Sequence, residues 1–258
     1  MDEKKPTILV TNDDGITAKG IASLVEIAKK FGNVVVVAPD KPQSGMGHAV
    51  SIHGILRVSE STIFGEDVKA FACSGTPADC VKFGISQVLK QKPDLVLSGI
   101  NHGNNSATNI LYSGTMSAAI EGAMEGVTSI GFSLLDYASD ADFSGAMHFG
   151  SKIIQATLND THLPVGFCLN VNFPKCTIEE IKGVKYCRQA EAFWDDWFEH
   201  RKDPGGKDYY WLTGEFHNHD QGDDTDEFAL AQNYVSVVPV QYDLTAYHTL
   251  KHIQQWEI

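Results

Sequence analysis

Two adjacent aspartates follow the first apolar run of the chain, in the stretch ILVTNDDGI at residues 8–16. Neighbouring carboxylates repel each other, and a cation between them relieves that repulsion. Carboxylate oxygens are the ligands that Mg²⁺ and Mn²⁺ prefer. Asp13 and Asp14 therefore predict a divalent-cation site. The simpler alternative is a turn at Asp13-Asp14-Gly15 whose charges are solvated.

Two further apolar runs also end in oxygen-bearing side chains close to glycine. The run at residues 33–40 leads into a loop with Ser44, and the run at residues 94–100 leads directly into Asn101. Serine and asparagine offer neutral oxygens to a cation. The carboxyl ends of parallel strands share one rim of an α/β sheet, so these side chains should converge there. Three converging strand ends favour a cation site over three unrelated turns.

A candidate phosphate site follows the third of these strands. The segment YSGTMSAAIEG, residues 112–122, places Ser113, Gly114 and Thr115 where a helix begins. Free backbone N–H groups and the helix dipole attract phosphate at such a position. Taken alone, Ser113 is more simply explained as a helix cap. Beside a predicted cation site, we favour phosphate binding.

The elements expected to hold these residues alternate along the first 175 residues. Strands are expected at residues 8–12, 33–40, 49–61, 68–75, 94–100, 128–135 and 168–174, and helices at residues 19–31, 76–89, 113–126 and 148–160. Continuous apolar strands between helices are typical of a parallel sheet that is buried on both faces. The predicted fold class is α/β, with a mostly parallel, doubly wound sheet.

The composition changes after residue 175. The segments at 192–200 and 208–216 are rich in aromatic residues and predict a hairpin or extended arm. A partner chain often covers such aromatics, although they can also pack on their own domain. A return strand at 234–244 and a terminal helix at 246–256 are expected to follow. We therefore divide the chain into an α/β core with the candidate cation and phosphate sites, residues 1–175, and a C-terminal extension that we expect to serve in oligomerisation, residues 176–258.

Charge and cysteine content restrict the class of protein further. The net charge of −13 argues against binding to nucleic acid or to an anionic membrane. No run approaches the length of about 18 apolar residues that a membrane helix needs. The 5 cysteines are odd in number and form no CxxC motif, which suits a reducing compartment. We expect a cytoplasmic protein.

The motifs together resemble the SurE family, the survival protein E metal-dependent nucleotidases. They are TNDDGI, SG.GHA after APDK, GTPADCV, SGIN.G.N, YSGT..AA.EG and NVN.P, and the resemblance resumes at TDEFAL and YVSVVPV. It implies a three-layer Rossmann-like core and one divalent cation per subunit, Mg²⁺ or Mn²⁺. It also implies hydrolysis of nucleoside 5′- and 3′-monophosphates, and a homodimer or homotetramer with exchanged C-terminal segments.

The resemblance also assigns roles to individual residues. The implied metal ligands are Asp13, Asp14, Ser44 and Asn101, and the two aspartates are the implied catalytic residues. The residues implied around the phosphate are Asn105, Ser113, Gly114 and Thr115. Three positions depart from the family pattern without removing a ligand, so they bear on substrate preference: Ala107, Met116 and Asn233.

Two other enzyme classes fit the sequence poorly, and one non-enzymatic function remains open. A phosphatase with a nucleophilic Asp-x-Asp pair needs spaced aspartates, and Asp13 and Asp14 are adjacent. A dinucleotide oxidoreductase needs G-x-G-x-x-G after the first strand, which NDDGITAKG does not supply. A non-enzymatic nucleotide sensor on the same scaffold is the main alternative. Further candidates are a phosphate contact by His48 or His102, and a second metal near His217, His219 and Asp220.

Overall fold

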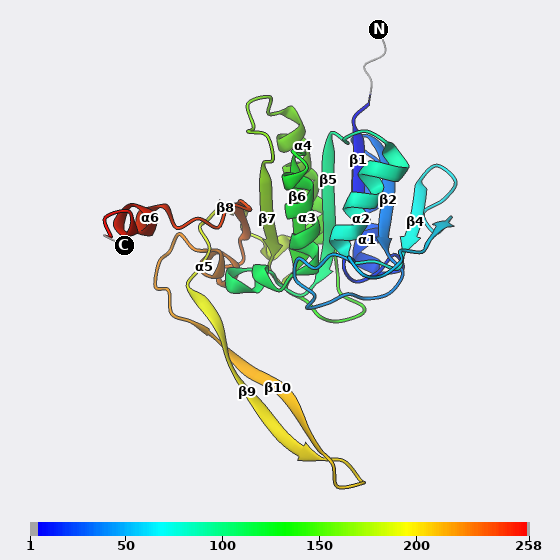
Figure 1. The fold of residues 1–258 in the computed structure, drawn as a ribbon. Helices are drawn as coiled ribbons and strands as arrows, with labels where there is room; N and C mark the ends of the chain where they lie inside the picture. Colours follow the sequence, from blue (N-terminus) through cyan, green and yellow to red (C-terminus); the bar gives the residue numbers. More distant parts are fainter. Residues whose placement is uncertain (1–4, 257–258) are drawn as a thin grey trace.

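The computed structural model describes residues 5–256, and in that range nine strands form one twisted sheet in the order β3-β4-β2-β1-β5-β6-β7-β11-β8 (Figure 1). The six strands from β4 to β7 in this order run parallel. At the two ends of the sheet, β3 lies antiparallel to β4, and β11 lies antiparallel to β7 and parallel to β8. The strands are β1 (Thr7–Thr11), β2 (Asn33–Pro39), β3 (Val58–Ser61), β4 (Lys69–Cys73), β5 (Leu95–His102), β6 (Ser129–Leu134), β7 (Cys168–Phe173), β8 (Val184–Tyr186) and β11 (Val235–Val240). The predicted α/β class with a mostly parallel sheet is confirmed.

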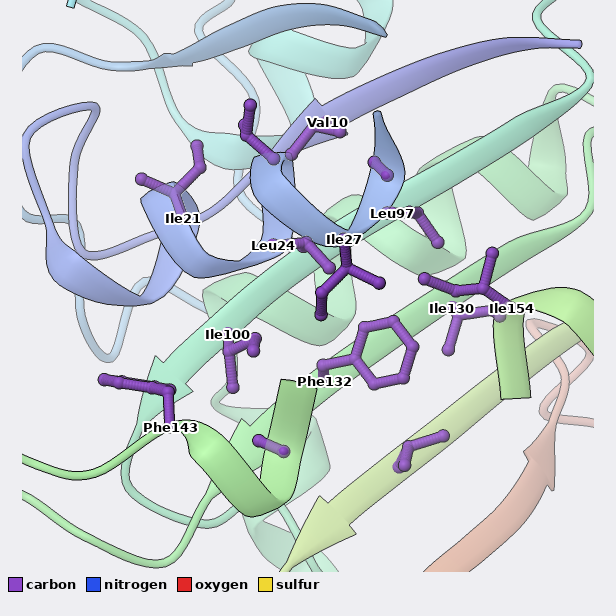
Figure 2. Packing of buried hydrophobic residues seen from close by; sticks show 14 of the residues in the cluster. Val10, Ile21, Leu24, Ile27, Leu97, Ile100, Ile130, Phe132, Phe143 and Ile154 are labelled. Atoms are coloured by element: carbon purple, nitrogen blue, oxygen red, sulfur yellow. The ribbon is translucent and has the colours of Figure 1, made fainter. Parts of the chain in front are cut away.

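Successive side chains of a strand point to opposite faces of the sheet, and in these strands the side chains on both faces are apolar. Helices therefore cover both faces. The α-helices are α1 (Lys19–Ala28), α2 (Pro77–Phe83), α3 (Gly114–Met124), α4 (Ser144–Asn159), α5 (Asp226–Ala231) and α6 (Tyr247–Ile253). In β1, Ile8 and Val10 pack with α1 and α4, and Leu9 packs on the other side with α2 and α3. Figure 2 shows the first of these clusters, where Phe132 lies among residues of α1 and the sheet.

The order in which the chain adds strands to the sheet reverses between β1 and β5. From β1 the chain adds β2 and β4 on one side, and then crosses back to place β5 on the other side of β1. In open α/β sheets, ligands bind in the crevice outside the carboxyl ends of the two strands at such a switch point. The fold therefore puts the residues after β1 and β5 at the position where a ligand site is expected.

The C-terminal part contributes to the main sheet and also leaves it. β8 and β11 extend the sheet beyond β7, so the sheet continues across the predicted boundary at residue 175, and the division into two units stays a prediction. Between them, β9 (Ala192–Lys202) and β10 (Asp208–Asn218) form the long hairpin that projects from the body in Figure 1. Among the residues described, no helix has the length and apolar character to cross a membrane.

Two predicted elements differ from the structure. Only Val58–Ser61 of the strand expected at residues 49–61 is extended in the sheet. The preceding segment instead bonds to the start of α2, where Asp79 accepts from the Ser51 backbone at 3.0 Å and Thr76 Oγ1 donates to the Ala49 carbonyl at 2.7 Å. The helix expected at residues 76–89 ends at Phe83 and continues as a π-helix, Gly84–Leu89. In the first segment, side-chain partners replaced the ladder hydrogen bonds that an apolar pattern alone suggests.

Candidate active site

The residues predicted from three separate strand ends meet at the switch point. Asp13 and Asp14 follow β1, Ser44 lies in the loop after β2, and Asn101 is near the end of β5. A pocket of about 390 Å³ opens there. Its lining includes five predicted site residues, namely Asp13, Ser44, Asn101, Asn105 and Ser113. The other three predicted residues, Asp14, Gly114 and Thr115, lie directly against this group, as described next.

Asp13 is held from the start of α3. The hydroxyl of Thr115 donates to Asp13 Oδ1, and Gly114 lies so close that an added Cβ would stand 2.6 Å from Asp13 Cβ. Burial, followed by repulsion from Asp14, raises the pKa of Asp13 to about 6, although the hydrogen bond from Thr115 opposes that rise. Thr115 is itself fully buried, and its hydroxyl positions Asp13.

Asp14 is fixed from the neighbouring strand. Its Oδ2 accepts the backbone N–H of His102 at 3.1 Å, which ties the end of β1 to the end of β5. Burial raises the pKa of Asp14, and the N–H of His102 opposes that rise. Two carboxylates are thus held side by side under a net desolvation penalty. A cation between them would remove much of that penalty.

Asn101 presents an oxygen to the same space. The register of β5 against β6 shifts between Ser98 and Asn101, and such irregularities redirect side chains next to active sites. The Nδ2 of Asn101 donates to the Gly103 carbonyl at 2.8 Å. The amide nitrogen is therefore occupied, and the carbonyl oxygen is the atom that remains for a cation.

The loop that carries Ser44 is fastened on both sides of that residue. Before it, the backbone N–H of Gln43 donates to the Asp13 carbonyl at 2.8 Å. After it, Ser117 Oγ on α3 donates to the Gly47 carbonyl at 2.8 Å. His48 Nε2 lies 2.8 Å from a carboxylate oxygen of Glu121, also on α3. The position of Ser44 is consequently set by β1 and α3, the two elements that hold Asp13.

The candidate phosphate-binding residues lie beside this cluster. Ser113 caps α3 by accepting the Met116 N–H at 3.0 Å, and it also faces the pocket. Asn105 is buried, and its Nδ2 donates to Ser133 Oγ at 2.7 Å, while its backbone N–H donates to Asn172 at 2.7 Å. The loop before α3 is therefore rigidly attached to β6 and β7.

The donor set fits a hard divalent cation. It consists of the buried carboxylate of Asp13 and the half-buried carboxylate of Asp14, each with a net desolvation penalty, and two neutral oxygens, from Asn101 and Ser44, on adjoining segments. Oxygen ligands of this kind suit Mg²⁺ or Mn²⁺ better than zinc, which prefers histidine and cysteine.

The histidine alternatives have other partners. His102 lines the pocket, with Nδ1 at 3.1 Å from the Ala138 carbonyl, whereas His48 lies against Glu121 outside that lining. Near His217, the acidic residues Asp220 and Asp224 are bound by Arg188 at 2.9 and 3.0 Å. Over the range 5–256, no three His, Cys, Asp or Glu side chains group as a metal site. The second-metal hypothesis has no support in this geometry.

The sequence alone did not identify the aromatic residues that line the pocket. Tyr112, Tyr137 and Trp194 line it, and they come from three distant segments. Tyr112 could have been noticed, because it directly precedes Ser113. Nothing local to Tyr137 or Trp194 indicates that they approach the site, since long-range packing brings them there.

Comparisons with known proteins agree with this architecture. The sequence model of the family described as "Survival protein SurE" matches residues 8–196. A Flavobacterium johnsoniae protein named "5'-nucleotidase SurE" is 55% identical over 100% of this chain and 99% of its own length. One of the same name from Christiangramia forsetii is 56% identical, with the same coverage. The crystal structure of the SurE protein from Aquifex aeolicus is 40% identical, superposes with a TM-score of 0.83, and covers 96% of this chain and 98% of its own.

Proposed function

The chain belongs to the SurE family, and on that premise we propose that it is a divalent-metal-dependent nucleotidase. The substrates would be nucleoside 5′- and 3′-monophosphates, cleaved to nucleoside and phosphate. The observation that carries this proposal is the pair of desolvated carboxylates at the switch point, Asp13 and Asp14, with the start of α3 against Asp13. Full-length relatives named 5'-nucleotidase support the same activity.

The proposed metal ligands are Asp13, Asp14, Ser44 and Asn101. When bound, Mg²⁺ or Mn²⁺ supplies Lewis acidity that lowers the pKa of water and offsets negative charge on the phosphoryl group. The chain itself supplies position and electrostatics, which is most of what phosphoryl transfer requires of a protein. Thr115 and His102 orient the two carboxylates, either of which can accept a proton from the attacking water.

The phosphate is proposed to lie at the start of α3. The first backbone N–H groups of a helix have no partner within the helix, and they point along the positive end of its dipole. Gly114 and Thr115 are the first two residues of α3, Gly114 lies next to Asp13, and the capping Ser113 lines the pocket. These donors stabilise charge that develops on the phosphoryl oxygens. Asn105 is proposed to shape the same end of the pocket.

We expect EDTA to abolish phosphate release from nucleoside monophosphates, and added Mn²⁺ or Mg²⁺ to restore it. A saturating cation at about 100 times its Kd should also stabilise the fold by about 2.7 kcal/mol, raising Tm by roughly 5–10 °C. Phosphate assays and thermal scans measure the two effects separately. Full activity after exhaustive chelation would contradict the metal mechanism. Metal-dependent nucleotide binding without turnover would favour the sensor alternative.

We also propose that the protein is a cytoplasmic homodimer or homotetramer with exchanged C-terminal segments. In the β9–β10 hairpin, the side chains of Phe198, Tyr210 and Trp211 are 59–68% exposed to solvent. Helix α6 stands away from the body in Figure 1. Burying one such aromatic side chain is worth about 1.5–3 kcal/mol, which favours a covered surface. The 5 free cysteines suit a reducing compartment.

Light scattering on the intact protein is expected to give a mass well above 28.2 kDa. A variant in which an Asn-Gly turn replaces residues 197–213 would join the paired residues Asp196 and Gly214 and keep the base of the hairpin. It should form smaller oligomers while the metal still raises its Tm. A wild-type monomer of 28.2 kDa would refute the interface.

A further inference from the structure

Two chemically different groups of side chains line the candidate active-site pocket. The first group comprises the oxygen donors Asp13, Ser44 and Asn101, together with Ser113 at the start of α3. The second group comprises three aromatic side chains, Tyr112, Tyr137 and Trp194. Metal and phosphate chemistry uses the first group only. The aromatic group therefore needs an explanation of its own.

Trp194 is fixed in place before any ligand binds. Its indole Nε1 donates to Asn109 Oδ1 at 2.8 Å, across 85 residues of sequence. Its own strand, β9, is fastened at the first residue by Thr108 Oγ1, which donates to the Ala192 carbonyl at 2.7 Å. On the hairpin, the ring centroid of Phe216 lies 5.7 Å away. With its polar atom satisfied, Trp194 is still 45% exposed, and it lines the pocket.

Tyr137 and Tyr112 offer further exposed rings. Tyr137 lies against the backbone of Gly103, where an added Cβ would stand 2.3 Å from its ring. It is nevertheless 74% exposed, and Tyr112 is 63% exposed. Aromatic rings held at a pocket with open faces are suited to stacking on a flat heterocycle. Rigid rings also lose little conformational entropy when they bind a ligand.

We propose that Trp194, Tyr112 and Tyr137 form the nucleobase subsite of this pocket. The base stacks on these rings while the phosphate lies among the oxygen donors and the start of α3. This inference rests on the proposed nucleotidase function, and it names the residues that make the substrate a nucleotide and not a simple sugar phosphate. Trp194 contributes the largest ring, and Asn109 is its positioning residue.

The nearby amides indicate how selective this subsite is. The oxygen of Asn109 accepts from Trp194, and the Nδ2 of Asn104 donates to Ser106 Oγ at 2.7 Å. Both side chains are partly committed to the protein, so stacking outweighs hydrogen bonding to the edges of the base. Stacking depends on ring area and is tolerant of base identity. The subsite should accept all common bases, with purines preferred over pyrimidines.

The test compares AMP with ribose 5-phosphate, which has the same phosphate and sugar but no base. In Trp194→Ala, kcat/KM for AMP is expected to fall roughly 10-fold or more, mainly through KM, with ribose 5-phosphate changed less than about 2-fold. Tyr137→Ala should act in the same direction from a different segment. Trp194→Phe, which keeps an aromatic face, should retain most of the preference for AMP. Tyr186→Ala is the control, because Tyr186 is 84% exposed on β8 and outside this pocket.

Equilibrium binding by calorimetry gives a readout that needs no turnover. The wild type should bind AMP more tightly than ribose 5-phosphate, and Trp194→Ala should lose that difference. An equal loss for both ligands would assign Trp194 a structural role, and an unchanged ratio in both Trp194→Ala and Tyr137→Ala would overturn the subsite. If neither compound is hydrolysed, the proposed nucleotidase function fails, and the two binding constants still decide the stacking.

Discussion

Replacing Asp14 by asparagine is expected to lower kcat by about 10²-fold or more, equivalent to roughly 2.7 kcal/mol of transition-state stabilisation. The amide keeps the shape of the side chain and can still accept the N–H of His102, so the end of β1 should stay in place. What it loses is the negative charge that the proposed cation needs. Steady-state assays with saturating Mn²⁺ measure the effect, and the metal-induced rise in Tm should shrink as well.

The fold should survive this substitution. Because burial raises the pKa of Asp14, its ionised form costs folding free energy at neutral pH, and the neutral amide removes that cost. Asp67→Asn is a control that makes the same chemical change at an exposed residue paired with Lys29. Near-wild-type turnover in Asp14→Asn would reassign the aspartate pair to a simple turn.

The predicted ligand positions could be found from the sequence because strand ends are local features. The runs ILVT and LVLSGI are apolar and short. Each is followed by polar residues and then by a glycine, Gly15 after the first run and Gly103 after the second. A parallel sheet then brings such ends to one rim whatever the details of packing. Asp13 and Asn101 needed only this argument, and the structure places both in the same pocket.

Features that depend on long-range packing could not be found in this way. Trp194 lines the pocket and its indole donates to Asn109, a residue 85 positions away, and no local pattern encodes that contact. Glu121 lies in a helix of small residues, and it is buried and bound by His48 and Lys82, which come from distant segments. His48, a candidate phosphate contact from its place in the loop, is instead part of this cluster.

The cluster around Glu121 explains why α3 is central to the site. The start of the helix holds Asp13 through Thr115, and two later residues, Ser117 and Glu121, hold the loop that carries Ser44. One rigid element therefore fixes the relative positions of ligands that come from two strands. Active-site geometry needs this kind of support, because small displacements of the reacting groups are costly for rate.

Gly114→Ala is expected to damage the site directly, because the added methyl group would meet Asp13. Its Cβ would lie 2.6 Å from Asp13 Cβ and 2.9 Å from Asp13 Oδ2, which is closer than non-bonded atoms approach. The backbone of Gly114 is helical, so the effect comes from contact and not from conformational strain. Either Asp13 or the start of α3 must move, and we expect kcat/KM to fall by about 10²-fold.

Gly150→Ala provides a matched comparison for that substitution. Gly150 is also in a helix, α4, but there the added Cβ would meet Phe173 at 3.6 Å, an ordinary contact. Activity should be unchanged, and alanine in a helix should slightly stabilise the fold. The comparison separates displacement of Asp13 from a general effect of filling space. Equal activity of the two variants would mean that Asp13 has room to move without loss of function. In that case the close contact between β1 and α3 would not be what positions the proposed cation.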